Sequence, residues 1–279
     1  MKTLKDILTL SCDYVKSKKN SFSRRDVEDL IAFVLQIKRL DLYLKFDRPL
    51  EENELQKIRE GLKRLVACEP IQYIEGAVQF LNCSIQVTPS VLIPRPETEL
   101  LVEKIISELK NENLQGKVLL DLCCGSGCIG IAIKKHLPAL DVLLIDKSEP
   151  ALKVAHENAK LNQTEVTLLH GDLFAPLLSK KVDFLISNPP YIARSEYEGL
   201  DPSVKLYEPE MALISGDTGL ELYERIAKEY QRYVLSRAWL EIGASQGSVL
   251  RVLFQETGCK SVKLEQDLSG HDRFLNIHI

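Results

Sequence analysis

Residues 182–191 read Val182-Asp183-Phe184-Leu185-Ile186-Ser187-Asn188-Pro189-Pro190-Tyr191, a short apolar run that ends abruptly in Asn-Pro-Pro-Tyr. The apolar, β-branched content of the run predicts a buried strand. Two prolines cannot continue that strand, because neither donates a ladder hydrogen bond and both fix φ. An amide, a proline carbonyl and an aromatic ring are therefore expected at the carboxyl end of a strand. Ligands bind at that edge of an open α/β sheet, although a merely rigid turn would explain the tetrapeptide equally well.

The pattern around this stretch predicts an α/β fold with a doubly wound, mostly parallel sheet. From Lys117 onward, strand-like runs alternate with helix-like segments, as right-handed crossovers require. The seven expected strands are residues 118–120, 142–145, 166–169, 182–186, 238–242, 262–264 and 274–279. The expected helices are residues 97–110, 128–136, 148–161, 218–233 and 245–257.

The first part of the chain has a different character. In residues 1–72 apolar side chains recur at helical spacing, which predicts a small all-helical amino-terminal domain. Ser23 is a plausible N-cap there, and a last helix is expected from about Glu51 to Ala67. Residues 73–95 are expected to form a β-hairpin linker, and residues 96–279 the α/β domain. The strand residues of the linker are Tyr73, Ile74, Val78, Phe80, Ile85 and Val87.

Composition narrows the class of protein. The chain has 279 residues, 45% of them hydrophobic and 27% charged, with a net charge of −4. Because proteins that coat a duplex are usually basic, extensive nucleic-acid binding is not favoured, although a local basic patch is compatible with this charge. Direct nucleic-acid binding is not expected. No apolar run is long enough for a membrane span, and residues 1–20 lack a secretory signal. A cytoplasmic protein, a monomer without membrane contact, is expected.

Seven cysteines are interpreted as reduced, mostly buried thiols. They are Cys12, Cys68, Cys83, Cys123, Cys124, Cys128 and Cys259. They include no C-x-x-C pair, and a C-x-x-x-C-x-x-C radical cluster beginning at Cys124 would need a cysteine where Ile131 stands. No metal is expected, and the cluster at residues 123–128 is interpreted as small side chains packed in a strand-to-helix turn.

Acids at successive strand ends indicate a nucleoside site. Asp146 follows Asp121 by 25 residues, at the end of the second strand of this domain, where a carboxylate can bind a ribose diol. The loop D-x-C-C-G-S-G lacks the spacing of a pyrophosphate cradle, so a nucleoside without phosphate is favoured over a dinucleotide. Asp172, after the third strand, could accept from an adenine amino group. Each acid could alternatively cap a helix.

Arg95 is a further candidate. It lies between Pro94 and Pro96, which hold the segment extended and suit Pro96 to the first turn of a helix. The side chain could face the site or be only a solvated linker charge.

Together these motifs resemble those of a known enzyme family. The set D121-L-C-C-G-S-G127, Asp146, Asp172 and N188-P-P-Y191 is similar to class I S-adenosylmethionine-dependent amino-methyltransferases. The segment Leu92-Ile93-Pro94-Arg95-Pro96-Glu97-Thr98-Glu99, with the later Tyr207-Glu208-Pro209, narrows this to the release-factor glutamine methyltransferases, the PrmC/HemK family. The likeness spans nearly the whole chain. It implies a Rossmann-like methyltransferase sheet and a helical domain that docks the substrate.

The resemblance assigns roles to particular residues. It implies methyl transfer from S-adenosyl-L-methionine, leaving S-adenosyl-L-homocysteine, to the amide nitrogen (N5) of the Gly-Gly-Gln glutamine in class-1 peptide chain release factors. The implied catalytic residues are Asn188, Pro189 and Tyr191. The implied cofactor-binding residues are Cys123, Cys124, Gly125, Ser126, Gly127, Asp146, Asp172, Leu173 and Asn188. The implied substrate-binding residues are Asn188, Pro189, Pro190, Tyr191 and Arg95.

Cys123 is a departure from the family pattern. Family members usually carry glycine at this position, and a side chain could crowd the cofactor unless φ is negative there. Binding is still expected, because Gly125 and Gly127 remain.

The expected mechanism relies on orientation. No histidine lies near the motif to act as a general base. The Asn188 oxygen and the Pro189 carbonyl can accept both N–H groups of an amide and favour the positive charge that develops on its nitrogen.

Two rival functions remain open. An adenine-N6 methyltransferase acting on DNA or RNA could use the same tetrapeptide, but would need a basic target-recognition face. A non-catalytic cofactor-sensing protein is the other, and it would have no need of Asn188 and Tyr191.

Overall fold

The computed structural model describes residues 2–18 and 22–279. Its contacts divide the chain into two compact units. One extends to Ala77 and includes Asp201–Tyr207; the other comprises Val78–Leu200 and Glu208–Ile279. In the described part of the chain no helix is long and apolar enough to cross a membrane.

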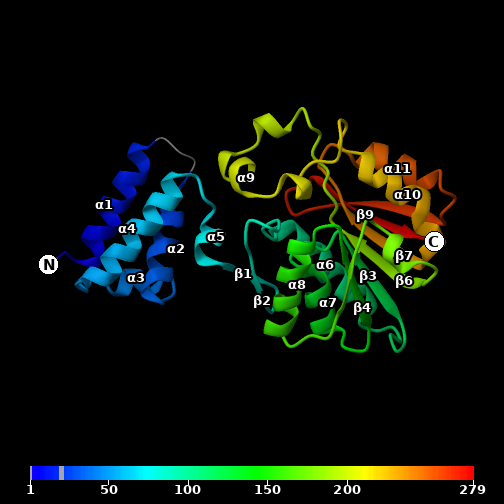
Figure 1. Cartoon of the computed structure of the whole chain (residues 1–279), viewed down its shortest axis with the longest axis horizontal. Coiled ribbons are helices and arrows are strands. Elements are labelled where there is room, and N and C mark those ends of the chain that lie inside the picture. Colours follow the sequence, from blue (N-terminus) through cyan, green and yellow to red (C-terminus); the bar gives the residue numbers. More distant parts are fainter. Residues whose placement is uncertain (1, 19–21) are drawn as a thin grey trace. The chain divides into compact units, whose positions relative to one another are not determined.

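The first unit is helical. Its helices are α1 (Leu4–Ser17), α2 (Arg24–Leu35), α3 (Asp41–Leu44), α4 (Glu52–Val66), α5 (Ile71–Glu75) and α9 (Pro202–Tyr207). Helices α1 to α5 run from blue to cyan in Figure 1. Ser23 is the N-cap of α2, as predicted, and its N–H donates to the Asp26 carboxylate over 2.7 Å. Helices α2 and α4 approach closely at Gly61, where an added Cβ would lie 2.4 Å from Leu30. An apolar core between the helices therefore holds this unit together.

The strands predicted at residues 73–87 are partly wrong. Tyr73 and Ile74 lie in helix α5, which begins after Pro70 and ends at Gly76 in the left-handed conformation. Proline before a first turn and glycine after the last turn suit a helix, and burial of its apolar side chains does not require a strand. The hairpin is shorter, with strands β1 (Ala77–Phe80) and β2 (Cys83–Gln86).

The second unit contains the predicted seven-stranded sheet. Its strands are β3 (Val118–Leu122), β4 (Asp141–Asp146), β5 (Thr167–His170), β6 (Val182–Ser187), β7 (Val234–Glu241), β8 (Ser261–Gln266) and β9 (Asp272–His278). They lie in the order β5-β4-β3-β6-β7-β9-β8. Strand β9 is antiparallel to β7 and β8, and the other neighbouring pairs are parallel. The prediction of a doubly wound, mostly parallel sheet is confirmed.

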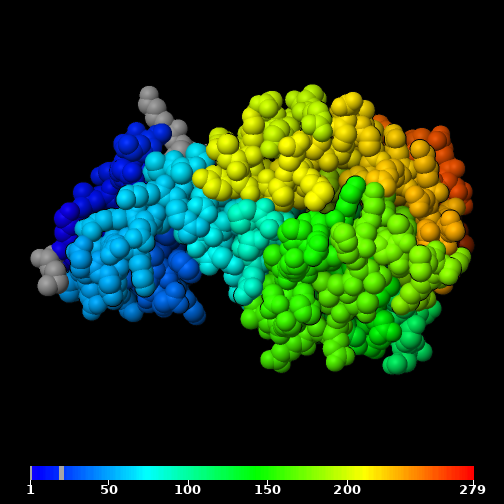
Figure 2. All heavy atoms as spheres, viewed as in Figure 1, coloured from blue at the N-terminus to red at the C-terminus, as the bar shows by residue number. Residues whose placement is uncertain are grey.

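Helices cover both faces of this sheet (Figure 1). They are α6 (Pro96–Leu109), α7 (Cys128–His136), α8 (Glu149–Leu161), α10 (Glu221–Tyr233) and α11 (Gly247–Gln255). Leu120 and Leu143 share a core with α10 and α11, whereas Leu144, next in its strand, meets α7 at Gly130. Alternate strand residues point to opposite faces, so each strand serves both layers. In Figure 2 the green atoms of this unit and its orange and red carboxyl-terminal segments form one contiguous body.

The strand order fixes where a site can form. From β3 the chain winds outward through β4 to β5, then returns to place β6 on the other side of β3. Leu122 and Ser187 are neighbours in the β3–β6 register. The loops that follow them, residues 123–127 and 188–191, therefore leave the sheet side by side at its topological switch point, where ligands bind in such folds.

Candidate active site

A cavity opens at this edge of the sheet. Its walls come from the loop after β3, the ends of β4, β5 and β6, and the segments 90–95 and 209–212. Most of the predicted site residues line it: Arg95, Cys123, Cys124, Gly125, Ser126, Asp146, Asp172, Leu173, Asn188 and Pro190. Gly127, Pro189 and Tyr191 are not among the lining residues.

The loop after β3 is held by Asp146. The N–H of Gly125 donates to Asp146 Oδ2 over 2.8 Å, and the N–H of Ser148 donates to Oδ1 over the same distance. Burial raises the pKa of the Asp146 carboxyl, although these backbone donors oppose the shift. Gly125 has φ +53, and an added Cβ would meet no atom within 4 Å. The loop therefore presents an open backbone surface beside a fixed carboxylate.

Gly127 has a packing role. It is the N-cap residue of α7 with φ +76, and an added Cβ would lie 3.1 Å from Ala155 and from Ile131. Glycine is needed here because the helix begins close to its neighbours in a left-handed turn.

Cys123 lies in the cavity wall with φ +60. From the sequence, the side chain is expected to avoid crowding a ligand only if φ is negative. That condition is not met. Burial raises the pKa of this thiol far above its ordinary value, so it is protonated at neutral pH. All seven cysteines are free, but only Cys83, Cys124 and Cys128 are buried, so the expectation of mostly buried thiols holds for three. In residues 2–18 and 22–279 no group of three potential ligands is placed to hold a metal ion.

Asp172 and Leu173 close another side of the cavity. Burial would raise the pKa of Asp172, but Arg225 at 3.1 Å and Lys147 at 3.4 Å lower it below its usual range. Asp172 is thus ionised and partly exposed, and its carboxylate can still accept a hydrogen bond. Leu173, with φ +49, is buried against the sheet core.

The Asn-Pro-Pro-Tyr turn is fixed from behind. Pro189 and Pro190 are buried, and the Tyr191 carbonyl accepts from Gln246 Nε2 over 2.9 Å. Burial raises the pKa of the Tyr191 phenol to about 12, so it stays neutral. Gly243 leaves room for the Gln246 side chain that holds the Tyr191 carbonyl, since an added Cβ would lie 2.9 Å from Gln246 Oε1.

Arg95 both lines the cavity and makes an ion pair. Its guanidinium contacts the Glu208 carboxylate, whose other oxygen accepts from the Ile93 N–H over 3.1 Å. Glu208 is buried. The Tyr-Glu-Pro segment is thereby fastened to the Ile-Pro-Arg-Pro segment, so the two sequence motifs meet in space.

Comparison with known proteins gives the family. The PrmC N-terminal domain matches residues 6–76, and the Methyltransferase small domain matches residues 96–200. The chain is 39% identical over 275 residues to the release factor glutamine methyltransferase of Chlamydia trachomatis serovar D, covering 97% of this chain and 92% of the relative. The chain belongs to the release factor glutamine methyltransferase family.

A second relative agrees with this membership, and a solved structure shares the fold. The release factor glutamine methyltransferase of Thermodesulfovibrio yellowstonii is 38% identical over 260 residues, covering 92% of this chain and 93% of the relative. The hMettl16 catalytic domain is 17% identical with a TM-score of 0.54, covering 70% of this chain and 74% of that chain. The latter likeness concerns the fold alone. The resemblance predicted from the motifs is thus confirmed as membership of the release factor glutamine methyltransferase family.

Two polar residues behind the turn were missed by the sequence reasoning. Thr98 lines the cavity and lies within hydrogen-bond reach of Asn188, and Glu241 is buried at the end of β7. The signal was available, because Glu241 interrupts the apolar run Trp239-Leu240-Glu241-Ile242 at the carboxyl end of a predicted strand. A buried carboxyl in that position needs partners.

Proposed function

We propose that this protein transfers a methyl group from S-adenosylmethionine to the side-chain amide nitrogen of a glutamine in class-1 peptide chain release factors. One observation supports this more than any other. The loop after β3 and the Asn-Pro-Pro-Tyr turn after β6 leave adjacent strands at one edge of the sheet, where Leu122 pairs with Ser187. A nucleoside-bearing cofactor and an amide would therefore meet across a single cavity.

The cavity suits the proposed cofactor. S-adenosylmethionine supplies an electrophilic methyl group on a sulfonium. The open space at Gly125, where an added Cβ would meet no atom within 4 Å, leaves room for its methionine part beside the Cys123 side chain. The Asp146 carboxylate, held by two backbone N–H groups, can still accept from ribose hydroxyls. Leu173 offers an apolar wall and Asp172 an acceptor for adenine.

The turn suits a primary amide. A carboxamide nitrogen is a weak nucleophile, because its lone pair is shared with the carbonyl. The Asn188 oxygen and the Pro189 carbonyl would accept its two N–H groups, direct its lone pair and stabilise the developing positive charge. The neutral Tyr191 ring would cover the amide. Solvent would take the proton after transfer, so the turn needs no base.

The helical unit would dock the release factor. A protein substrate needs a surface beyond the cavity, and the helices α1 to α5 carry exposed apolar side chains. Such a substrate, which acts in translation termination, places the reaction in the cytoplasm. We propose that the enzyme acts there as a monomer and without nucleic acid as a direct partner.

Methyl transfer from labelled cofactor tests the function. Purified class-1 release factor should become labelled, and replacing the glutamine of its Gly-Gly-Gln motif should abolish the label. Unmethylated DNA and RNA are assayed alongside as controls for adenine methylation. Label on nucleic acid alone would reject the proposed substrate.

A further inference from the structure

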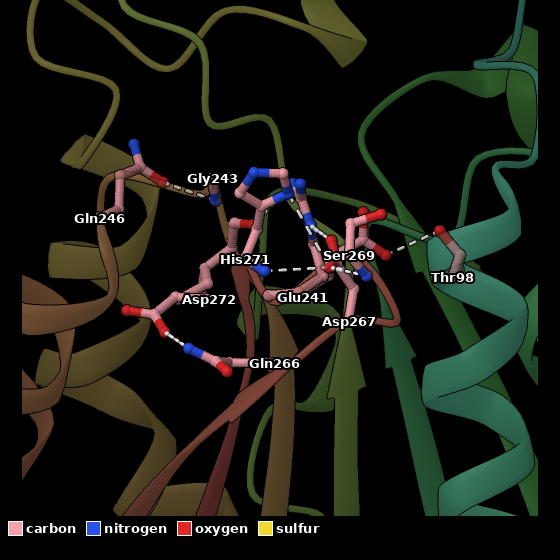
Figure 3. A network of polar contacts seen from close by, with 11 residues as sticks. Thr98, Glu241, Gly243, Gln246, Gln266, Asp267, Ser269, His271 and Asp272 are labelled. Carbon is pink, nitrogen blue, oxygen red and sulfur yellow. Dashed lines mark hydrogen bonds and ion pairs between the residues drawn. The ribbon is translucent and has the colours of Figure 1, made fainter.

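A buried chain of hydrogen bonds leads from the turn into the sheet. Asn188 Nδ2 donates to Thr98 Oγ1 over 3.2 Å, and the Thr98 hydroxyl donates to Glu241 Oε2 over 2.7 Å. Thr98 and Glu241 are each only 2% exposed. Figure 3 shows Thr98 pointing from α6 to the Glu241 carboxylate at the end of its strand. Water is thus excluded from the two partners that lie behind Asn188.

The single hydroxyl proton of Thr98 determines which end of the Asn188 amide faces it. A hydroxyl has one proton to donate, and an ionised carboxylate is the stronger acceptor. When that proton is given to Glu241, Thr98 Oγ1 can only accept from its other neighbour. The group of Asn188 that faces Thr98 must then be the NH₂. The Asn188 oxygen is left free to accept from a ligand.

We propose that Thr98 and Glu241 are positioning residues that hold the Asn188 amide with its oxygen toward the substrate nitrogen. This role rests on the proposed function, in which Asn188 accepts an N–H of the substrate amide. An inverted Asn188 would present N–H groups to the N–H groups of the substrate and oppose binding in the reactive orientation. The pair therefore selects a nitrogen that carries hydrogens, such as that of a primary amide.

The protonation state of Glu241 controls this arrangement. Burial raises the pKa of Glu241 to about 7, while hydrogen bonds from Thr98 and Asn188 and the charge of Arg273 act in the opposite direction. Protonated Glu241 can itself donate to Thr98, which frees the threonine proton for the Asn188 oxygen and allows the amide to invert. The oriented state is therefore present above the pKa of Glu241 and lost as pH falls through it.

The hydroxyl and thiol groups around Glu241 stay neutral near pH 7 and so do not imitate the effect. Burial raises the pKa of Tyr191 and Cys128 to about 12, and that of Tyr223 further, so all three stay neutral. Tyr223 donates its hydroxyl to the Glu241 carbonyl over 2.6 Å. The charged neighbours are Glu97 on α6 and Arg273 on β9, and Arg273 is paired with Asp267 at 3.3 Å.

Two substitutions of Thr98 test the positioning role. Thr98→Val keeps the shape and removes the hydroxyl, whereas Thr98→Ser keeps the hydroxyl. We expect Thr98→Val to lower kcat for release factor at least about tenfold, with a calorimetric Kd for S-adenosylmethionine within about threefold of wild type. Thr98→Ser should stay within about threefold in kcat. The matched control is Thr167→Val, at an exposed position on β5. A normal kcat in Thr98→Val, or an equal loss in Thr98→Ser, would overturn the role.

The pH profile gives a second, separate readout. In the wild-type enzyme kcat should rise as pH increases through about 7. In Glu241→Gln that step should disappear because glutamine does not titrate in this range, whereas a step from buried Asp121, whose pKa is raised to about 8, would remain in both enzymes. Thermal melting identifies any variant that fails to fold. An unchanged profile in folded Glu241→Gln would contradict the assignment.

Amide exchange decides the question without a substrate. The side-chain ¹H–¹⁵N pair missing from the spectrum of Asn188→Ala identifies Asn188. Exchange of the Asn188 amide protons with solvent should accelerate at least about tenfold in Thr98→Val and remain slow in Thr98→Ser and Thr167→Val. Equal exchange in all variants would reject the inference even if release factor is methylated. Conversely, absence of release-factor methylation would reject the proposed function, and the exchange of the Asn188 amide protons would still test how Thr98 positions Asn188.

Discussion

At the scale of single residues, the site depends on groups whose freedom is already restricted. Asp121 is one example. Its carboxyl is fully buried beside the loop after β3 and accepts from the Gly130 N–H over 2.9 Å. Burial raises its pKa to about 8, so it is largely protonated at neutral pH and adds little charge to the cavity. The carboxylate at the cavity edge that stays ionised is that of Asp172, whose pKa Arg225 and Lys147 lower.

Asn188→Ala should separate catalysis from cofactor binding. Removal of the acceptor oxygen leaves the substrate amide unoriented, and kcat should fall by about 10²–10³-fold, as when one stabilising group is removed from other preorganised sites. The calorimetric Kd for S-adenosylmethionine should change by less than about threefold, because the loop at residues 123–126 and Asp146 are untouched. Near-normal turnover would remove Asn188 from the mechanism.

Cys123→Gly should tighten cofactor binding. The cysteine holds a left-handed backbone that costs a side chain about 1–2 kcal/mol, and its thiol occupies the cavity wall. Glycine removes the backbone strain and the thiol, so we expect the calorimetric Kd for S-adenosylmethionine to be at least about threefold lower. Leu178→Gly is the matched control, since Leu178 has φ +56 but is 79% exposed and does not line the cavity. Weaker binding in Cys123→Gly would show that the thiol itself contacts the ligand favourably.

At the scale of elements, one asparagine on α8 makes hydrogen bonds to both the β1–β2 hairpin and the loop after β3. Asn158 is fully buried; its Nδ2 donates to the carbonyls of Gln86 and Ser126, and its Oδ1 accepts from the Gln86 N–H over 2.7 Å. The hairpin and the loop thus depend on the same side chain for their backbone hydrogen bonds.

Asn158→Ala should therefore destabilise the second unit. It leaves the Ser126 carbonyl buried, and the Gln86 carbonyl and N–H part-buried, without this partner. A buried unsatisfied group costs about 1–3 kcal/mol. We expect the free energy of unfolding in urea to fall by about 3 kcal/mol or more. Replacement of the exposed Glu157 next to it by alanine should change that free energy by less than about 0.5 kcal/mol. A loss equal to that of the control would mean that the hairpin is held by other contacts.

The strands and helices also show which parts of the fold could be predicted from the sequence. The strands of the sheet were predictable because they are apolar, short and separated by helices with clear ends, and the register then brings residues 123–127 and 188–191 together. Helix α5 was not predicted, because five residues are too few to show a period and Tyr73 and Ile74 suit either structure. The partnership of Thr98 with Glu241 spans 143 positions, and only the fold reveals it.

At the scale of the whole molecule, the two units differ in the surfaces that they present. The cavity lies entirely within the second unit. The first has exposed apolar side chains on and beside α3, among them Leu40 at 73% and Leu44 at 84% exposure. Surface of that kind is typical of a protein-binding face.

Charges placed on this face should weaken protein recognition alone. In the double variant Leu40→Asp/Leu44→Asp we expect the KM for release factor to rise at least about tenfold, with the cofactor Kd unchanged, because apolar contact area becomes charged. Leu178→Asp places one such charge on an exposed leucine of the other unit and should leave KM unaltered. Equal KM values in the double variant and the Leu178→Asp control would contradict docking of the release factor at Leu40 and Leu44.

The short helix α9 has a consequence for how this protein could be divided or recombined. Residues Asp201–Tyr207 belong to the helical unit, where the Tyr207 hydroxyl donates to the Ala67 carbonyl over 2.8 Å. The next residue, Glu208, binds Arg95 in the catalytic unit. The polypeptide thus passes between the units three times, and no single cut in the gene yields two complete modules. A chimaera joined near residue 77 inherits a helix from the wrong parent, so functional exchange of amino-terminal domains between relatives requires residues 201–207 to be exchanged with them.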